Sequence, residues 1–109
     1  MPTTYKVLGQ IAPSASTNVS FYTCPSGTQT IVSTIVVCNR SSSSATFRIY
    51  LRPNNETLAD RHYLCYDTPI PPNDSIFLTF GATMDAADQL YCFTTSANLS
   101  FSAFGSEIT

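Results

Sequence analysis

The most regular hydrophobic pattern lies in the middle of the chain, where two runs of β-branched and aromatic residues flank a serine-rich segment. In the second run, residues 45–52, Phe47, Ile49 and Leu51 alternate with polar or amphipathic residues. A period of two is typical of a β-strand with one buried face. The first run, residues 29–39, is apolar at nearly every position of its second half, which predicts a central strand covered on both faces. We expect these two strands to form a central hairpin.

Shorter runs of the same kind predict six more strands, at residues 4–10, 18–24, 62–67, 75–80, 90–95 and 98–104. The last two of these are predicted to form a second hairpin. Residues 68–74 contain three prolines, so we expect them to cross a sheet edge without pairing. Residues 105–109 are expected to be a short tail.

About eight strands at regular spacing predict an all-β fold, a single antiparallel β-sandwich. The pattern leaves a jelly roll and an immunoglobulin-like Greek key open, although the chain has no tryptophan, which is a hallmark of antibody domains. Residues 1–17 are predicted to be an N-terminal strand or arm with its connection, and residues 18–109 the sandwich core. With 109 residues, the whole chain is expected to be one domain.

Charged residues make up 11% of the chain, which is less than half of the usual share. Because charge keeps sheet edges apart, so low a charge on a β-rich chain favours association. The alternative is an ordinary sandwich with a hydroxyl-rich surface. The five Lys and Arg residues form no basic stripe, so we expect no nucleic-acid partner.

No apolar run reaches the length of about 18 residues that a membrane span needs, so no membrane partner is expected. The first residues lack the charged and apolar regions of a secretory signal. We therefore expect the protein to be made and kept in the cytosol unless a particle or lysis carries it out.

The four cysteines, Cys24, Cys38, Cys65 and Cys92, are widely spaced and form no C-x-x-C pair. A zinc site is therefore disfavoured. Free buried thiols are the preferred interpretation because nothing directs the chain to an oxidising compartment. Disulfides are left open as the alternative.

Candidate catalytic and metal-binding residues are few. A catalytic triad would have to use the single histidine, His62, and the chain has no G-x-S-x-G elbow. Asp85 and Asp88, with Asp74 as a third ligand, could share a calcium ion, but aspartates that accept bonds from turn amides are the simpler interpretation. We therefore predict no enzyme activity, no catalytic residues, no metal site and no cofactor.

The tyrosines suggest a different kind of site. Tyr63, Tyr66 or Tyr91, clustered with Asp and Asn on one exposed rim, could stack on a sugar ring or anchor a protein interface. A carbohydrate-binding or adhesin-type module that contacts a host surface is therefore the alternative function.

The chain resembles a family of small virion structural proteins of tailed bacteriophages, notably phages of cyanobacteria and other aquatic bacteria. The stretches that carry the resemblance are YKVLGQ at residues 5–10, YTCPSGT at 22–28, VSTIVVCNR at 32–40 and ANLSF at 97–101. With shorter matches they span almost the whole chain, and the motifs are structural rather than catalytic.

The resemblance implies a non-enzymatic accessory protein of the virion, assembled in the host cytoplasm. It would belong to the tail, neck, baseplate or fibre attachment, or to the head as capsid decoration. The implied partners are major capsid, neck or tail proteins and further copies of the chain, as a trimer or hexamer. We expect the inter-subunit contacts at the two ends of the chain, at Tyr5, Lys6, Val7, Leu8, Gly9, Gln10, Gly105, Ser106 and Glu107.

Overall fold

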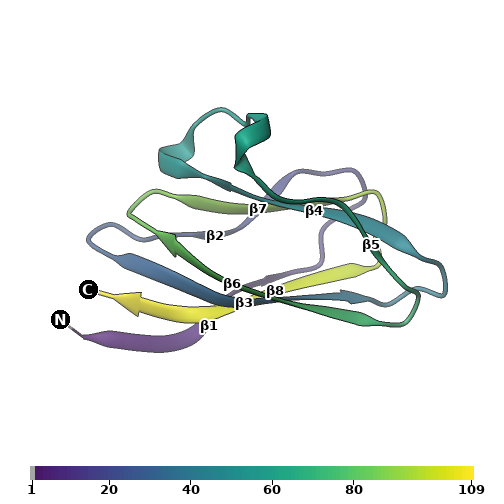
Figure 1. Ribbon diagram of the computed structural model, residues 1–109, viewed down its shortest axis with the longest axis horizontal. Coiled ribbons are helices and arrows are strands. Elements are labelled where there is room, and N and C mark those ends of the chain that lie inside the picture. Colours follow the sequence, from purple (N-terminus) through teal and green to yellow (C-terminus); the bar gives the residue numbers. More distant parts are fainter. Residues whose placement is uncertain (1) are drawn as a thin grey trace.

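The structure is a computed structural model that describes residues 2–109, and Figure 1 shows it as two layers of strands. The strands are β1 (Thr3–Ile11), β2 (Val19–Thr23), β3 (Gln29–Asn39), β4 (Ala45–Arg52), β5 (Tyr63–Ile70), β6 (Ser75–Met84), β7 (Gln89–Thr94) and β8 (Leu99–Ile108). Two short 3₁₀ turns, η1 (Pro53–Asn55) and η2 (Asp60–His62), lie between β4 and β5. The predicted all-β sandwich is confirmed.

The strands form two four-stranded antiparallel sheets, ordered β1-β8-β3-β6 and β2-β7-β4-β5. Except for β4 and β5, strands that follow each other in the chain lie in different sheets. This order is that of an eight-stranded jelly roll, and it differs from the seven- or nine-stranded immunoglobulin arrangement. The topology therefore decides between the two folds that the sequence left open.

Both predicted hairpins are wrong. Strands β3 and β4 have the predicted bounds, but they lie in opposite sheets, and so do β7 and β8. The serine-rich segment and the turn after Thr94 are thus connections between the two layers. A period of two identifies the buried face of a strand but not its partner, and this is why the pairing was missed.

Two segments predicted to be unpaired belong in part to strands, and residues 71–74 are outside any strand, as predicted. Strand β5 continues to Ile70 and pairs Pro69 with Thr46. A proline is tolerated there because β5 is an edge strand with a neighbour on one side only, so the missing N–H interrupts no second ladder. Strand β8 continues to Ile108 between β1 and β3, where the sequence predicted a tail.

The core lies between the sheets and is filled from alternate positions of the strands. The ring of Phe101 on β8 lies 6.0 Å from that of Phe47 on β4 and 6.1 Å from that of Phe21 on β2. In β3, buried residues alternate with exposed or half-buried ones, so this strand is central in its sheet but covered on one face only. The other face of its sheet is open to contacts.

Candidate functional site

The two segments predicted to carry inter-subunit contacts lie side by side. In the antiparallel pair of β1 and β8, Tyr5 is opposite Ser106 and Lys6 is opposite Gly105. Strand β1 is the outer edge of its sheet (Figure 1). The structure thus joins the N-terminal and C-terminal segments into one surface, and their role in contacts between subunits stays a prediction.

The side chains of β1 divide between two faces. Tyr5 is 84% exposed and Val7 is 48% exposed on the outer face of the sheet. Lys6 lies on the opposite face, where its Nζ is 3.3 Å from Glu107 Oε1. The hydroxyl of Tyr22, on a strand of the other sheet, donates to Glu107 Oε2 at 2.6 Å. The two charges of this surface are therefore turned toward the second sheet.

Other predicted interface residues serve the packing of the chain itself. A Cβ at Gly9 would lie 1.8 Å from the Phe21 carbonyl oxygen, and one at Gly105 would lie 2.0 Å from that of Ile31. Leu8 packs against the core, and Ser106 is buried. The glycines are needed for the close approach of neighbouring strands.

Three apolar residues on the outer face were not predicted as part of this surface, namely Ile31, Phe77 and Phe104. Phe77 is 71% exposed and Ile31 is 38% exposed. Together with Tyr5 and Val7 they are the large apolar residues of what we call the apolar outer face of the sheet β1-β8-β3-β6, where they lie among hydroxyl side chains such as those of Ser33 and Ser102. Strand β6 is apolar at both alternating sets of positions over residues 76–78, so its sequence pattern did not show which set faces out.

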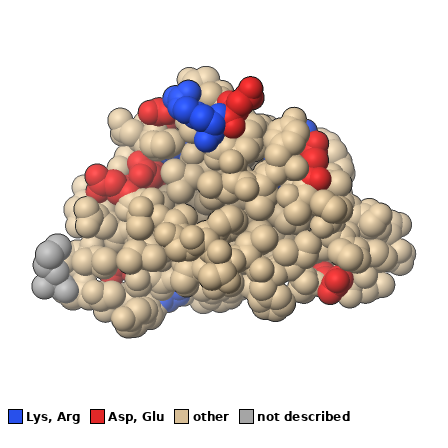
Figure 2. All heavy atoms as spheres, viewed as in Figure 1, with Lys and Arg blue, Asp and Glu red and all other residues tan. Residues whose placement is uncertain are grey.

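Charged residues are nearly absent from these four strands. Lys6 and Glu107 are the only Lys, Arg, Asp or Glu residues in β1, β3, β6 and β8, and they pair with each other. In the view of Figure 2, charged atoms gather in the upper part of the molecule, around the region of η1 and η2, and the lower part is mostly uncharged. Arg40, which follows β3, donates to Ser100 Oγ of β8 at 2.9 Å. Apart from that end, the apolar outer face is suited to a neutral partner.

The hydrogen bond from Tyr22 and the ammonium group of Lys6 lower the pKa of Glu107. A carboxylate whose pKa is lower in the folded chain stabilises the fold above its unfolded pKa of about 4.3, and this contribution is lost as the pH falls through the folded value. We expect Glu107→Gln to reduce the free energy of unfolding by about 1 kcal/mol at pH 7 and by less at pH 3, measured by urea denaturation. An equal effect at both pH values would contradict this assignment.

The predicted tyrosine cluster exists on the outer face of the second sheet. The rings of Tyr63 and Tyr66 are 4.9 Å apart, and Tyr91 stacks on Tyr50 at 5.1 Å. Burial raises the pKa of Tyr50 to about 12. However, guanidinium groups already cover ring faces here, since Arg48 Cζ lies 4.1 Å from the centroid of Tyr66 and Arg52 Cζ lies 4.8 Å from that of Tyr91.

Arg48 is in turn held by Asp67, with Nε 2.7 Å from Oδ1, and this contact lowers the pKa of Asp67. Tyr66 is the tyrosine of the cluster with a large exposed area, at 58%. A sugar ring would thus meet one exposed tyrosine beside an ion pair.

His62 has a structural role. Its side chain is buried, Nδ1 accepts a bond from the Ala59 amide at 3.0 Å, and Nε2 lies 3.1 Å from Glu56 Oε1. The hydrogen bond with His62 and that from Arg61 lower the pKa of Glu56. Both ring nitrogens contact residues of the segment between β4 and β5, so His62 stabilises the conformation of this connection.

The predicted calcium ligands are not brought together. Asp85 and Asp88 lie at one end of β6, whereas Asp74 precedes its other end. Asp88 accepts bonds from the amides of Asp85 at 2.9 Å and Asn54 at 2.8 Å, which confirms the simpler interpretation of a turn. Within residues 2–109, no three His, Cys, Asp or Glu side chains are grouped so that they could hold a metal ion.

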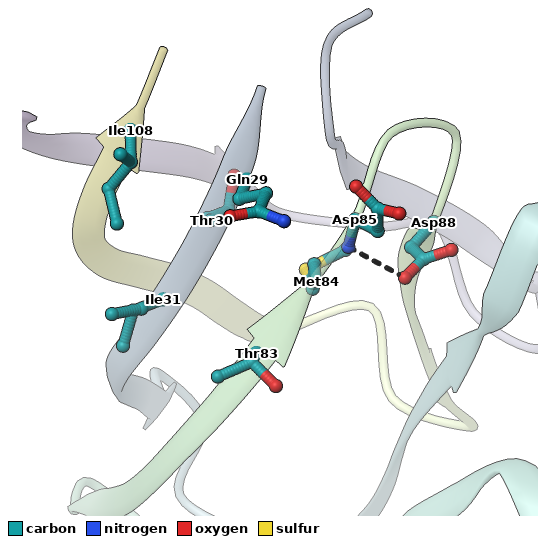
Figure 3. Close-up of a pocket in the computed structure, with 8 residues that line it drawn as sticks. All are labelled: Gln29, Thr30, Ile31, Thr83, Met84, Asp85, Asp88 and Ile108. Atoms are coloured by element: carbon teal, nitrogen blue, oxygen red, sulfur yellow. Dashed lines mark hydrogen bonds between the residues drawn. The ribbon is translucent and has the colours of Figure 1, made fainter. Parts of the chain in front are cut away.

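Figure 3 shows a pocket of about 400 Å³ at this end of the sandwich, with the bond from the Asp85 amide to Asp88. Its walls combine Asp85 with threonines, Gln29, Met84 and the apolar side chains of Ile31 and Ile108. The Asp88 carboxylate, which also lines the pocket, accepts hydrogen bonds from the backbone amides of Asp85 and Asn54.

All four cysteines are free, as preferred from the sequence, but Cys38 and Cys65 are half-buried rather than buried. Cys24 and Cys92 are buried, and burial raises the pKa of the Cys92 thiol to about 12. In the part of the chain that the structure describes, none of the helices is long and apolar enough to cross a membrane.

The fold and the surface define a small jelly-roll sandwich with an exposed edge strand and a neutral, apolar sheet face. No protein-family model and no curated protein matches the sequence. The resemblance to phage virion proteins therefore stays a prediction.

Among solved structures, the chain is similar to chains of infectious bursal disease virus. For the Gx strain the TM-score is 0.55 at 12% identity, over 97% of this chain and 30% of that one. For the Gt strain it is 0.53 at 11% identity, over 96% of this chain and 31% of that one. The chain thus spans less than a third of the solved chains that it matches. At these identities the likeness shows the fold.

Proposed function

We propose that the chain is a non-enzymatic structural component of a virus particle, a binding module present in several copies. The observation that carries the proposal is the neutral, apolar outer face of a jelly-roll sheet, bounded by an edge strand. Exposed apolar patches of this kind mark interaction sites. The likeness in fold to chains of infectious bursal disease virus supports it.

The resemblance of the sequence to small virion proteins of tailed phages supports a finer form of the proposal. The protein would then be a tail, neck, baseplate or fibre component, or a decoration protein of the head, assembled in the host cytoplasm. Its partners would be the neighbouring virion proteins and further copies of itself. No step of this function requires a catalytic residue or a cofactor.

We expect the protein to co-purify with particles from cultures that produce it, and immunogold labelling to place it on them. Label over the whole head would identify a decoration protein, and label at one pole a tail, neck or fibre component. A particle-free fraction of the same culture is the control. Protein found only in that fraction would contradict the proposal.

A carbohydrate-binding module is the alternative, and one observation favours it: the exposed ring of Tyr66 beside Asp67 and Arg48. Exposed aromatic rings with nearby polar groups are suited to sugar rings. If the protein is absent from particles and binds to a glycan array, the carbohydrate-binding function is favoured over the structural one.

A further inference from the structure

Strand β1 has a free row of backbone donors and acceptors. The Thr109 amide donates to the Pro2 carbonyl at 3.1 Å, and the register places Thr3 opposite Ile108. Because hydrogen-bonded and non-bonded pairs alternate in an antiparallel ladder, residues 4 and 6 bond to β8. Residues Thr3, Tyr5 and Val7 therefore direct their N–H and C=O groups away from β8, toward the free edge.

This edge lacks the features that protect the edges β2 and β5, and residues 75–79 of β6 form a regular stretch of the same length. Strand β2 has five residues, and β5 contains Pro69 and the left-handed Asp67 with φ of 48°. Strand β6 is interrupted at Gly81, where φ is 63° and the register shifts. From residue 3 to residue 7, before its own bulge, β1 has a regular register and no proline. Short strands, prolines and bulges are the usual obstacles to edge pairing.

The charge and polarity of the neighbouring surface indicate the partner. Lys6, the single charged residue of β1, is bonded to Glu107 on the inner side. A groove of mostly apolar surface runs beside the edge, between Tyr5 and Val7 on one side and Ile31 and Ser33 on the other. A partner must therefore offer a neutral edge strand beside a neutral, apolar face. The chain itself has such a surface.

We propose that β1 pairs antiparallel with β1 of a second copy of the chain, around a two-fold axis at Tyr5. This inference rests on the proposed function, in which the chain assembles with copies of itself, and it names the surface. Tyr5 then lies opposite Tyr5 of the other copy, and Thr3 opposite Val7. This is the one register in which all three outward-facing residues bond, and the two sheets become one continuous sheet.

A two-fold axis makes the interface self-complementary, so it closes without leaving a free β1 edge. Lys6 lies opposite Thr4 of the other copy, so the two ammonium groups do not face each other. The exposed rings of Tyr5 meet across the axis on the apolar outer face. The same contact can join two trimers into a hexamer.

The register is tested by cross-linking Thr3→Cys mixed with Val7→Cys. Residues in a hydrogen-bonded antiparallel pair have Cα atoms about 5.5 Å apart, within the range that a disulfide spans. We expect the mixture to form a disulfide dimer under mild oxidation. Each variant alone is the control, because two copies of residue 3 would lie about 13 Å apart along the strands. Equal dimer yields in the mixture and the controls would overturn the register.

The contact is tested by analytical ultracentrifugation of the purified protein, whose chain mass is 11.9 kDa. Wild type is expected as a dimer or a multiple of it. Tyr5→Pro removes an outward N–H that β8 does not use and two of six inter-subunit bonds, so we expect the dissociation constant to rise at least tenfold. Circular dichroism checks that this variant stays folded.

The matched control is Phe77→Ser, which removes an exposed aromatic ring of the same face from the far strand β6 and should leave the dimer unchanged. A monomeric wild type, or dissociation by Phe77→Ser but not by Tyr5→Pro, would overturn the inference. Because the protein in this experiment is free of particles, a monomer in solution that still labels particles would leave the proposed function standing.

Discussion

Gly9→Ala is expected to destabilise the fold by about 3 kcal/mol, the upper end of the usual cost of overpacking. The added Cβ would lie 1.8 Å from the carbonyl oxygen of Phe21. That atom belongs to the backbone of β2, so it cannot move aside as a flexible side chain could. Strand β1 would have to separate from β2, which would loosen its bonds to β8. The difference in the free energy of unfolding is measured by urea denaturation.

Gly27→Ala is the matched control for this prediction. Gly27 has a φ of 70°, and a Cβ there would meet nothing within 4 Å. Its substitution is expected to cost about 1 kcal/mol, the penalty of a left-handed conformation alone. If Gly9→Ala were no more destabilising than Gly27→Ala, this would contradict the conclusion that β1 and β2 approach each other closely at Gly9.

Asn39→Ala is expected to destabilise the fold by about 3 kcal/mol, because it leaves several buried polar groups without partners. The side chain is buried at the end of β3. Its Nδ2 donates to the carbonyl oxygens of Ser43 at 2.9 Å and Pro71 at 3.1 Å. Its Oδ1 accepts from the amide of Ser41 at 3.0 Å and from its hydroxyl at 2.9 Å. The midpoint of urea unfolding measures the effect.

Asn39 connects the serine-rich crossing between the sheets to the segment before β6, so its loss should loosen one end of the sandwich. Asn98→Ala is the control, since Asn98 is exposed and its side chain makes no such contacts. That variant is expected within about 0.5 kcal/mol of wild type. Equal midpoints for the two variants would contradict the role of Asn39.

The strands could be predicted from the sequence because side-chain alternation is a local property. Strands β3 and β4 have their predicted bounds, and the others differ by a few residues at their ends. The largest differences are in β5, β6 and β8, which continue past the predicted ends. An edge position accommodates Pro69, a bulge accommodates Gly81, and two neighbouring strands hold the last residues of β8.

The candidate surface was predicted in part. Tyr5 and Val7 were chosen from a sequence resemblance, and the structure places both on an exposed face. Gly9 and Gly105 were chosen in the same way, but they allow strands of the chain itself to approach closely. Phe77 was missed because residues 76–78 are apolar at both alternating sets of positions. Which face is covered depends on the second sheet, and the pattern of one strand does not contain that information.

By itself, the sequence determined the class of fold, the positions of the strands and the low charge of the surface. These follow from local periodicity and from composition. The tertiary structure alone decided the strand order, the two crossings that replaced the predicted hairpins, and the union of β1 with the end of β8. Pairing depends on the packing of residues about 100 positions apart, because two layers must bury each other's apolar faces before either is stable.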